Sequence, residues 1–192
     1  PEDEKVGDTL KKYGLSRGGY FLYVGNISFR KNAWTLIQAY ADSGARDSVD
    51  LVLAGQQLAS AKEILDAARA LGLGDRLRLL GYVPDAALPA LYSGSRAFLF
   101  PTYYEGFGIP ILEAMACGTR VLIGNQGAAP EVANGHAIVV DPFEIESVAE
   151  GIRQLLAETS VDVEAAAAHA AGYTWSVCAK RTVDLYERVL NA

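Results

Sequence analysis

Several residue patterns are missing from this chain of 192 residues, and each absence excludes a class of protein. Only two cysteines are present, so a small domain stabilised by several disulfide bonds is not indicated. Cys117 lies in an apolar helical stretch, where we expect a buried free thiol and hence a reducing compartment. No apolar run approaches the roughly 18–20 residues of a membrane-spanning helix, and no signal peptide opens the sequence. We therefore expect a cytoplasmic protein.

A dense run of basic residues is also missing. The formal net charge is −6 at pH 7, which argues against a nucleic-acid partner but leaves room for a small basic pocket. The two histidines, His136 and His169, belong to no metal-binding cluster, and no Asp-x-Asp motif stands at a strand end. We expect no metal and no cofactor, and we expect His169 to face solvent from an alanine-rich helix.

Common nucleotide-binding and hydrolase motifs are missing as well. The first expected strand is followed by Gly25-Asn26-Ile27-Ser28 rather than by the glycine pattern G-x-G-x-x-G. The P-loop sequence G-x-x-x-x-G-K-[ST] does not occur, and neither does the serine nucleophile elbow. Hydride transfer and serine hydrolysis are therefore not indicated.

What the sequence does contain is a regular alternation of short apolar runs with stretches of helical periodicity. The expected strands are 20–24, 49–54, 77–80, 97–100, 120–123 and 137–140. The expected helices are 32–43, 60–71, 85–93, 109–118, 130–133, 144–158, 163–171 and 175–190. Strands that alternate with helices form a mostly parallel sheet, and wholly apolar strands indicate a sheet covered on both faces. The predicted fold class is α/β, a doubly wound, Rossmann-like sheet of about six strands with C-terminal helices.

The expected domain organisation is simple. Residues 1–19 are polar and are expected to form a linker or a short leading helix, whereas residues 20–192 are expected to form one domain. Because the first residue is Pro1 rather than methionine, we expect that a further segment precedes this chain. Ligands of doubly wound sheets bind beyond the carboxyl ends of the strands, so a site is expected in the loops there.

The loop after the fourth expected strand is rich in glycine and carries two carboxylates. Gly106 and Gly108 would let the backbone approach a ligand closely. The helix that begins near Ile109 would direct free N–H groups toward a phosphate. Glu113 could then hold a ribose diol, and Glu105 could reach a sugar beyond the phosphate. The alternative is an ordinary loop and helix start, in which Glu113 only complements the helix dipole.

The sequence E-G-F-G-I-P-I-L-E-A-M-A-C-G-T, with seven residues between Glu105 and Glu113, resembles the signature of glycosyltransferase family 4. Members of this family have the GT-B fold, in which two Rossmann-like domains face a cleft. The resemblance covers about residues 20–190 and implies that the chain is the C-terminal, donor-binding half. It implies a nucleotide sugar and an N-terminal acceptor domain, absent from this chain, as partners. It also leaves room for peripheral membrane contact of the full enzyme.

The segment Tyr23–Asn32 resembles the glycine loop of the same family, which is followed by a basic residue and a helix. Arg30 and Lys31 would face the donor diphosphate, and Lys31 is the closer match. A cation at a helix start is unfavourable for the helix alone, so a bound diphosphate explains the pair better than solvation does. Many members have arginine directly after the glycine. Here Asn26 follows Gly25, so either Arg30 compensates or donor affinity is lower.

Three shorter segments allow two interpretations each. The turn after the third expected strand resembles the family's base-contacting segment, with the backbone near Val83 against the nucleobase, but a plain strand-to-helix turn explains it equally well. Residues 125–132 resemble the loop before the family's Pro-Glu helix, where Glu131 supports the phosphate loop or caps the helix. Tyr103 and Tyr104 either line the sugar pocket or pack in the core or at the rim.

The resemblance implies transfer of a sugar from a nucleoside-diphosphate sugar to an acceptor hydroxyl, with retention of the anomeric configuration. Lys31 would stabilise the leaving diphosphate and Glu105 would orient the sugar, so these two are the expected catalytic residues. The segment around Lys31 is similar to members that use GDP-mannose, which favours a mannosyltransferase of polysaccharide biosynthesis over one that uses UDP-sugars. The isolated chain is expected to bind its donor weakly and without turnover. The expected donor-binding residues are Gly25, Asn26, Arg30, Lys31, Val83, Glu105, Gly106, Phe107, Gly108, Ile109 and Glu113.

Other functions stay open at this point. A nucleotide-sugar epimerase of GT-B fold would need catalytic acids and a histidine at places that cannot be matched here. A receiver-like module would need acidic residues at the end of the first strand, where Gly25 and Asn26 stand. A flavodoxin-like module is a related alternative. A non-catalytic relative that binds a nucleotide sugar or another protein is disfavoured by the intact pair of Glu105 and Glu113.

Overall fold

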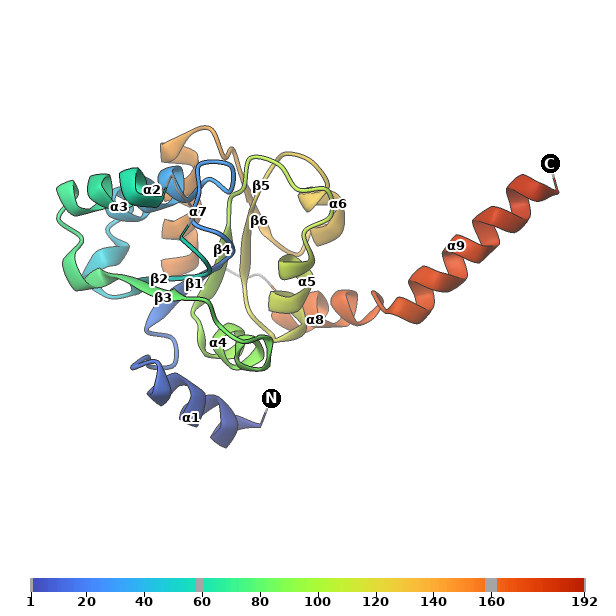
Figure 1. Ribbon diagram of the computed structural model, residues 1–192, viewed down its shortest axis with the longest axis horizontal. Coiled ribbons are helices and arrows are strands. Elements are labelled where there is room, and N and C mark those ends of the chain that lie inside the picture. Colours follow the sequence, from blue (N-terminus) through green and yellow to red (C-terminus); the bar gives the residue numbers. More distant parts are fainter. Residues whose placement is uncertain (1, 58–60, 158–161, 192) are drawn as a thin grey trace.

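The computed structural model describes residues 2–57, 61–157 and 162–191. Its strands form one sheet in the order β3-β2-β1-β4-β5-β6, and all neighbouring strands run parallel (Figure 1). The strands are β1 (Tyr20–Val24), β2 (Asp50–Ala54), β3 (Leu77–Gly81), β4 (Ala97–Phe100), β5 (Val121–Gly124) and β6 (Ile138–Val140). The expected doubly wound α/β fold is confirmed.

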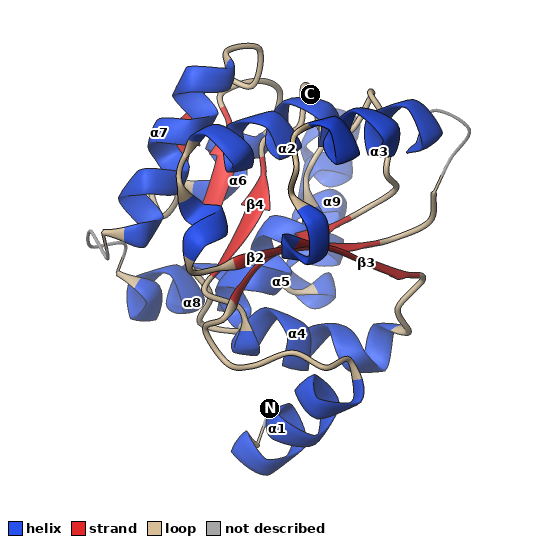
Figure 2. Ribbon diagram, turned by 90° about the vertical axis from the view of Figure 1, so that its left-hand side faces the viewer, coloured by secondary structure: helices blue, strands red, loops and turns tan. Residues whose placement is uncertain are grey.

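Helices cover both faces of the sheet, as Figure 2 shows, with α2, α3 and α7 on one side and α4, α5 and α8 on the other. The helices are α1 (Asp3–Lys12), α2 (Ala33–Asp42), α3 (Ala61–Ala70), α4 (Leu88–Gly94), α5 (Ile109–Ala116), α6 (Ala129–Ala133), α7 (Ile145–Leu156), α8 (Val163–Ala171) and α9 (Trp175–Leu190). This cover explains the apolar strands, because every residue of β4 and β5 is buried on whichever face it points to.

Most expected elements lie within one or two residues of the observed ones, and the differences have local causes. The expected helix 85–93 divides into a 3-10 turn at Asp85–Ala87 and the helix α4. Proline stands in the first turn of α4, where its missing N–H is tolerated, so the α-helix begins later than its apolar pattern suggests. Two expected boundaries, the start of a helix at residue 60 and the end of another at residue 158, lie outside the described residues.

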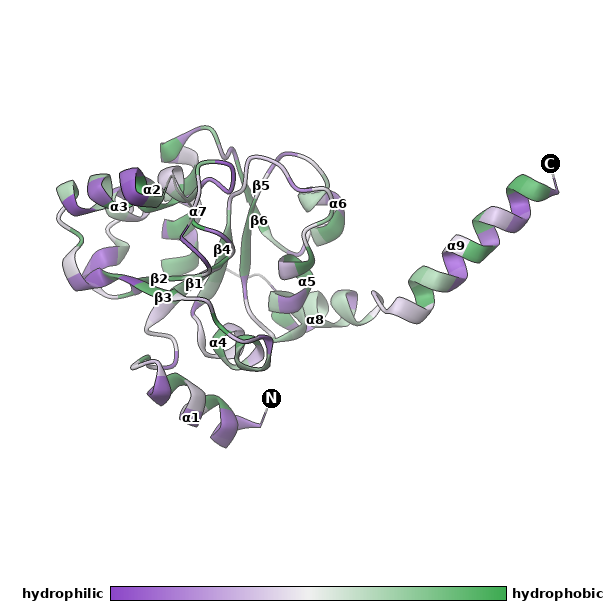
Figure 3. Ribbon diagram, in the orientation of Figure 1, coloured by the Kyte–Doolittle hydropathy of each residue, from purple (hydrophilic) through white to green (hydrophobic). Residues whose placement is uncertain are grey.

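The two terminal helices differ in how they contact the body. Helix α1 packs against α4 and buries Val6 and Leu10. Helix α9 extends away from the body at the other end (Figure 1), and none of its residues is buried. Apolar residues are interspersed along it (Figure 3), and Trp175 is 83% exposed. Among the described residues, no helix is long and apolar enough to cross a membrane.

The strand order reverses between β1 and β4. Strands β2 and β3 lie on one side of β1, and strands β5 and β6 lie on the far side of β4. The two central strands, β1 and β4, share only two residue pairs, Phe21 with Ala97 and Leu22 with Phe98, whereas β1 and β2 share five. The carboxyl ends of β1 and β4 are therefore not hydrogen-bonded to each other, and the loops that follow them diverge. In doubly wound sheets this switch point is where ligands bind.

Two glycines allow β1 and β2 to approach closely at the same edge. Gly55 has φ +154°, and a Cβ built on it would lie 2.0 Å from the carbonyl oxygen of Gly25. The N–H of Gly25 in turn donates to the carbonyl oxygen of Ala54 at 2.9 Å. A side chain at position 55 would therefore push apart the two strand ends that precede the switch point.

Replacing Gly55 by alanine is expected to lower the free energy of unfolding by roughly 2–4 kcal/mol, because the new methyl group collides with backbone atoms that cannot rotate away. Urea unfolding followed by circular dichroism measures this change. The matched control is Gly7→Ala in α1, where a Cβ meets open space; that change is expected to stabilise by about 0.5–1 kcal/mol. Equal unfolding midpoints for Gly55→Ala and the parent protein would contradict the steric argument.

Candidate functional site

An ion pair at the switch point joins the loops that follow β1 and β4. Lys31 Nζ lies 2.7 Å from Glu105 Oε1, and the two residues are 74 positions apart in the sequence. Their side chains are only 18% and 12% exposed, so solvent weakens the attraction less than it would at the surface. Lys31 Nζ also lies 5.6 Å from the centre of the Phe100 ring. The structure thus brings together the two residues that the sequence nominated for catalysis.

The β1–α2 loop (residues 25–32) holds Lys31 through its own backbone. The N–H of Lys31 donates to Ser28 Oγ at 3.3 Å, and the N–H of Asn32 donates to the carbonyl oxygen of Phe29 at 2.9 Å. Ile27 is fully buried and forms an isolated parallel bridge with Gln57. These contacts therefore fix the loop that carries Lys31 before α2 begins.

The β5–α6 loop (residues 125–128) supports Glu105 from another direction. The N–H of Ala128 donates to the carbonyl oxygen of Glu105 at 3.1 Å. Gly127 has φ +64°, and a Cβ there would lie 2.7 Å from that same oxygen. The sequence left open whether Glu131 supports the phosphate loop or caps a helix, and the observed contacts with Glu105 come from two small residues before it. Glu131 itself is exposed in the first turn of α6.

The start of α5 offers backbone donors next to Glu105. Gly108 caps the helix in the left-handed region, with φ +94°, and no side chain caps it. Among the residues that the structure describes, the N–H groups of Gly106, Phe107 and Ile109 donate to no protein acceptor. The unpaired N–H groups of a helix start carry partial positive charge, so this position favours an anion.

Glu113 lies about one helical turn after the start of α5 and is exposed. One of its oxygens, Oε2, accepts a hydrogen bond of 3.1 Å from the hydroxyl of Tyr92 on α4. Burial raises the pKa of Tyr92, and the neighbouring Glu113 carboxylate raises it further, so Tyr92 stays a donor. Within the part of the chain that the structure describes, Tyr92 is the one hydrogen-bonding partner of the Glu113 carboxylate, which does not contact the ion pair. Its other oxygen remains available at the surface.

Two other residues of the β1–α2 loop, Asn26 and Arg30, lie near the buried Tyr23. Its hydroxyl donates to the carbonyl oxygen of Asn26 at 3.0 Å. Burial raises the pKa of Tyr23, the Glu105 carboxylate raises it further, and the exposed Arg30 guanidinium lowers it. Arg30 and Glu105 are thus both near enough to Tyr23 for their charges to act on its hydroxyl.

The turn after β3 has one buried and one exposed side chain. Val83 is 5% exposed, whereas its neighbour Tyr82 is 68% exposed. Gly81 has φ +67°, a conformation that suits glycine, and ends the strand. Because the Val83 side chain points into the core, only its backbone is left to meet a ligand at this edge.

The prediction that His169 faces solvent is wrong. Its Nε2 lies 2.8 Å from the carbonyl oxygen of Val132, and its ring packs between those of His136 and Tyr173, with centroids 5.2 Å from each. Helix α8 packs against α5, and its small alanine side chains let the two helices approach closely. The ring of Tyr173 then reaches Phe107 in the β4–α5 loop at 6.0 Å.

Two contributors to the site were not found from the sequence. Asn32 is fully buried and bridges two loops with its amide group. Phe143, in the loop after β6, stacks on Tyr103 with ring centroids 4.9 Å apart. Asparagine is common as a cap before a helix, so its presence there does not by itself indicate a bridge, although the Asn32 side chain makes no cap bond. No sequence signal links Phe143 to Tyr103.

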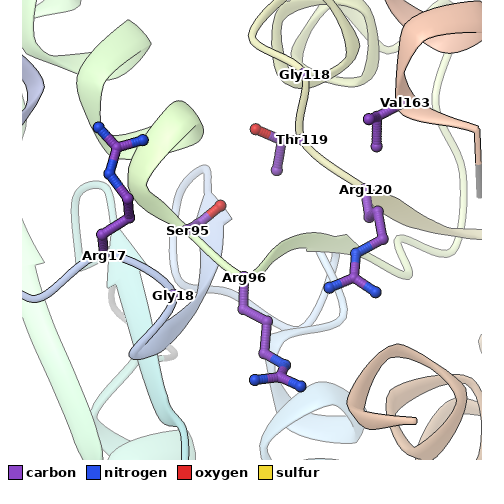
Figure 4. A pocket seen from close by; sticks show the side chains of 8 residues that line it. All are labelled: Arg17, Gly18, Ser95, Arg96, Gly118, Thr119, Arg120 and Val163. Carbon is purple, nitrogen blue, oxygen red and sulfur yellow. The ribbon is translucent and has the colours of Figure 1, made fainter. Parts of the chain in front are cut away.

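A hollow of about 350 Å³ lies at the opposite edge of the sheet from the ion pair, where β1, β4 and β5 begin (Figure 4). Its lining residues are Arg17, Gly18, Ser95, Arg96, Gly118, Thr119, Arg120 and Val163. Arg17 pairs with Asp3 at 2.9 Å, and Arg96 donates to the carbonyl oxygen of Leu156 at 3.0 Å. Arg17 points away from Arg96 and Arg120 in Figure 4, so the three guanidinium groups do not converge.

Groups of three or more His, Cys, Asp or Glu side chains that could hold a metal ion are not found within the described ranges 2–57, 61–157 and 162–191. The free cysteines are Cys117, which is half-buried, and Cys178, which is exposed on α9. Burial raises the pKa of the Cys117 thiol, which therefore stays protonated and unreactive.

Comparison with known proteins identifies the family. A family model described as "Glycosyl transferases group 1" matches residues 9–171, which include the whole site. The O-antigen chain mannosyltransferase B of Escherichia coli is 37% identical over 184 residues, or 93% of this chain and 48% of that protein. The serotype-specific mannosyltransferase WbdA of Escherichia coli is 30% identical over 98% of this chain and 24% of its own length.

A solved structure has the same fold. Anabaena HepE, crystallised in complex with UDP and glucose, superposes with a TM-score of 0.82 at 20% identity, over 98% of this chain and 53% of that one. The chain thus spans about half the length, or less, of the relatives that it matches. Since the family model covers most of the sequence, the chain belongs to the group 1 glycosyltransferases and has the fold of their GT-B C-terminal domain.

Proposed function

We propose that this chain binds the nucleoside-diphosphate sugar for a retaining glycosyltransferase, with GDP-mannose as the favoured donor and a hydroxyl group as acceptor. The observation that carries the proposal is the contact between Lys31 and Glu105 beside the start of α5. A cation, a carboxylate and backbone donors that have no acceptor among the described residues lie together at the switch point, which is where doubly wound sheets bind nucleotides.

The diphosphate is proposed to bind between Lys31 and the N–H groups at the start of α5. Lys31 pairs with Glu105 in the free protein, so an arriving diphosphate competes for the ammonium group. The N–H groups of Gly106, Phe107 and Ile109 supply neutral donors, which have no other acceptor in residues 2–57, 61–157 and 162–191. Arg30, which is exposed, adds a second positive charge, and the side-chain amide of Asn26 adds an uncharged donor in the same loop.

The sugar and the ribose are proposed to lie on opposite sides of the diphosphate. Glu105 accepts hydrogen bonds from sugar hydroxyls once Lys31 has turned to the phosphates. Glu113 accepts from the ribose diol with the oxygen that Tyr92 leaves free. The backbone at Val83 contacts the base, since its side chain is buried. Gly25 and Gly108 keep the surrounding backbone within reach of these groups.

The transfer step needs no base from this chain in the proposed scheme. The bond between the anomeric carbon and the phosphate oxygen breaks while the acceptor oxygen bonds to that carbon on the same face. The acceptor proton passes to an oxygen of the departing phosphate. Lys31 and the N–H groups of α5 stabilise the charge that develops there. Neither a metal nor a cofactor enters this proposal.

The preference for mannose rests on the names of relatives and on the basic segment around Lys31. Two relatives at 37% and 30% identity are named mannosyltransferases, and one of them acts on an O-antigen chain by its name. The Anabaena structure was solved with UDP and glucose, so the fold itself does not decide the base. We further propose that the rest of the protein supplies an acceptor-binding domain. The protein is proposed to be cytoplasmic, with peripheral contact between the full enzyme and a membrane.

Calorimetric titration of this chain with GDP, UDP, ADP and GDP-mannose tests the donor site. One nucleotide is expected to bind saturably, and GDP is expected to bind more tightly than UDP or ADP. No sugar transfer is expected. Lys31→Ala is expected to weaken binding roughly tenfold or more, because a charge-assisted hydrogen bond contributes about 1.5–3 kcal/mol. Glu113→Ala is expected to weaken it by a similar factor. The matched control is Lys11→Ala, which removes an exposed cation on α1. Unchanged affinity in both site variants would exclude the proposed arrangement.

Gly106→Ala separates ligand binding from folding. A Cβ at this position meets no atom within 4 Å, and its φ is not positive, so the free energy of unfolding is expected to stay within about 0.5 kcal/mol of the parent. Nucleotide affinity is nevertheless expected to fall several-fold, because the methyl group occupies space that the diphosphate needs. Thermal melting and calorimetry on the same preparation measure both quantities. Parental affinity in a fully folded variant would show that nothing binds against Gly106.

A further inference from the structure

The side chain of Asn32 joins three loops at the switch point. Its Nδ2 donates one hydrogen bond to the carbonyl oxygen of Pro101 and another to that of Pro142, each at 2.7 Å. Pro101 directly follows β4, and Pro142 lies in the β6–α7 loop (residues 141–144). Asn32 itself ends the β1–α2 loop and is 0% exposed. One amide group thus connects the segments that carry Lys31, Glu105 and Phe143.

Asparagine suits this position for two independent reasons. Asn32 has φ +57°, a left-handed conformation that asparagine and glycine tolerate better than other residues. Its amide nitrogen has two hydrogens, and the two carbonyl oxygens use both of them. Aspartate would keep the shape but offer no donor, and glycine would keep the backbone but offer no side chain. Because both partners are acceptors, the orientation of the amide is fixed.

The bridged loops make further contacts that tie them into one unit. Phe143 stacks on Tyr103, and the Tyr103 hydroxyl lies 3.4 Å from Thr35 Oγ1 on α2. A backbone path of only a few residues runs from Pro101 to Glu105, and Lys31 is the residue next to Asn32. We propose that Asn32 is a positioning residue, which holds Lys31 and Glu105 at the spacing that the donor diphosphate requires. This inference rests on the proposed function.

Its test is a double-mutant cycle on this chain with GDP, and with UDP if only UDP binds. Asn32→Gly keeps the left-handed backbone and removes both hydrogen bonds. In the parent background it is expected to weaken nucleotide binding roughly tenfold, the loss of two well-aligned hydrogen bonds that hold the site. In the Lys31→Ala background the same change is expected to cost less than about threefold, since the residue that it positions is gone. Combined with Glu113→Ala, its effect is expected to be additive.

The matched control is Asn134→Gly, which alters the only other described non-glycine residue with positive φ. Asn134 is exposed at the end of α6, and nucleotide affinity should stay within about twofold. Asn32→Asp is the second site variant and replaces Asn32→Gly if that protein does not fold. It keeps the side-chain shape but turns both donors into acceptors, so it should weaken binding at least as much.

The outcomes separate the two ideas. If Lys31→Ala binds nucleotide as the parent does, the proposed function fails. If Lys31→Ala weakens binding but Asn32→Gly costs the same factor in both backgrounds, Asn32 does not act through Lys31 and the inference is overturned. If no nucleotide binds to the parent chain, the inference is tested by urea unfolding of the parent, Asn32→Gly, Lys31→Ala and the double variant. A coupling between positions 31 and 32 supports the inference, and additive unfolding energies overturn it.

Discussion

The half-buried ion pair between Lys31 and Glu105 is the constraint on which the rest of the site depends. Two opposite charges can be removed from water here only because each neutralises the other. Their contact in turn requires that the loops after β1 and β4 meet, although these strands share only two residue pairs. The surrounding backbone bonds serve to keep that meeting point fixed.

Support for the pair comes from three loops at the carboxyl edge, those after β1, β5 and β6. Ser28 holds the backbone of Lys31, and Ala128 holds the backbone of Glu105. Asn32 ties the two loops together and adds the loop after β6. None of these supporting groups is charged. Lys31 can therefore exchange Glu105 for a phosphate group while the hydrogen bonds between the loops remain in place. A frame of this kind suits a binding site that must hold a doubly charged ligand and then release it.

The sequence predicted those features that depend on local composition. β1 and β4 were predicted to the residue because both are apolar throughout and end at a glycine or a proline. Both charged partners of the pair were also nominated, each from its own motif. Their direct contact was not, since a distance across 74 positions depends on packing rather than on spacing. The error at His169 has the same origin, because only the packed helices reveal that its ring is covered.

The position of α9 gives this protein two optically distinct tryptophans. Trp34 lies half-buried in α2, two residues after Asn32, whereas Trp175 stands almost fully in solvent at the start of α9. These are the only tryptophans in the chain. Fluorescence from Trp175 is therefore that of an indole in water, whereas the emission from Trp34 comes from an indole that is partly packed against the core. A quencher dissolved in the buffer therefore reduces the emission of Trp175 more than that of Trp34, so the two signals can be told apart and changes around α2 can be followed in the second.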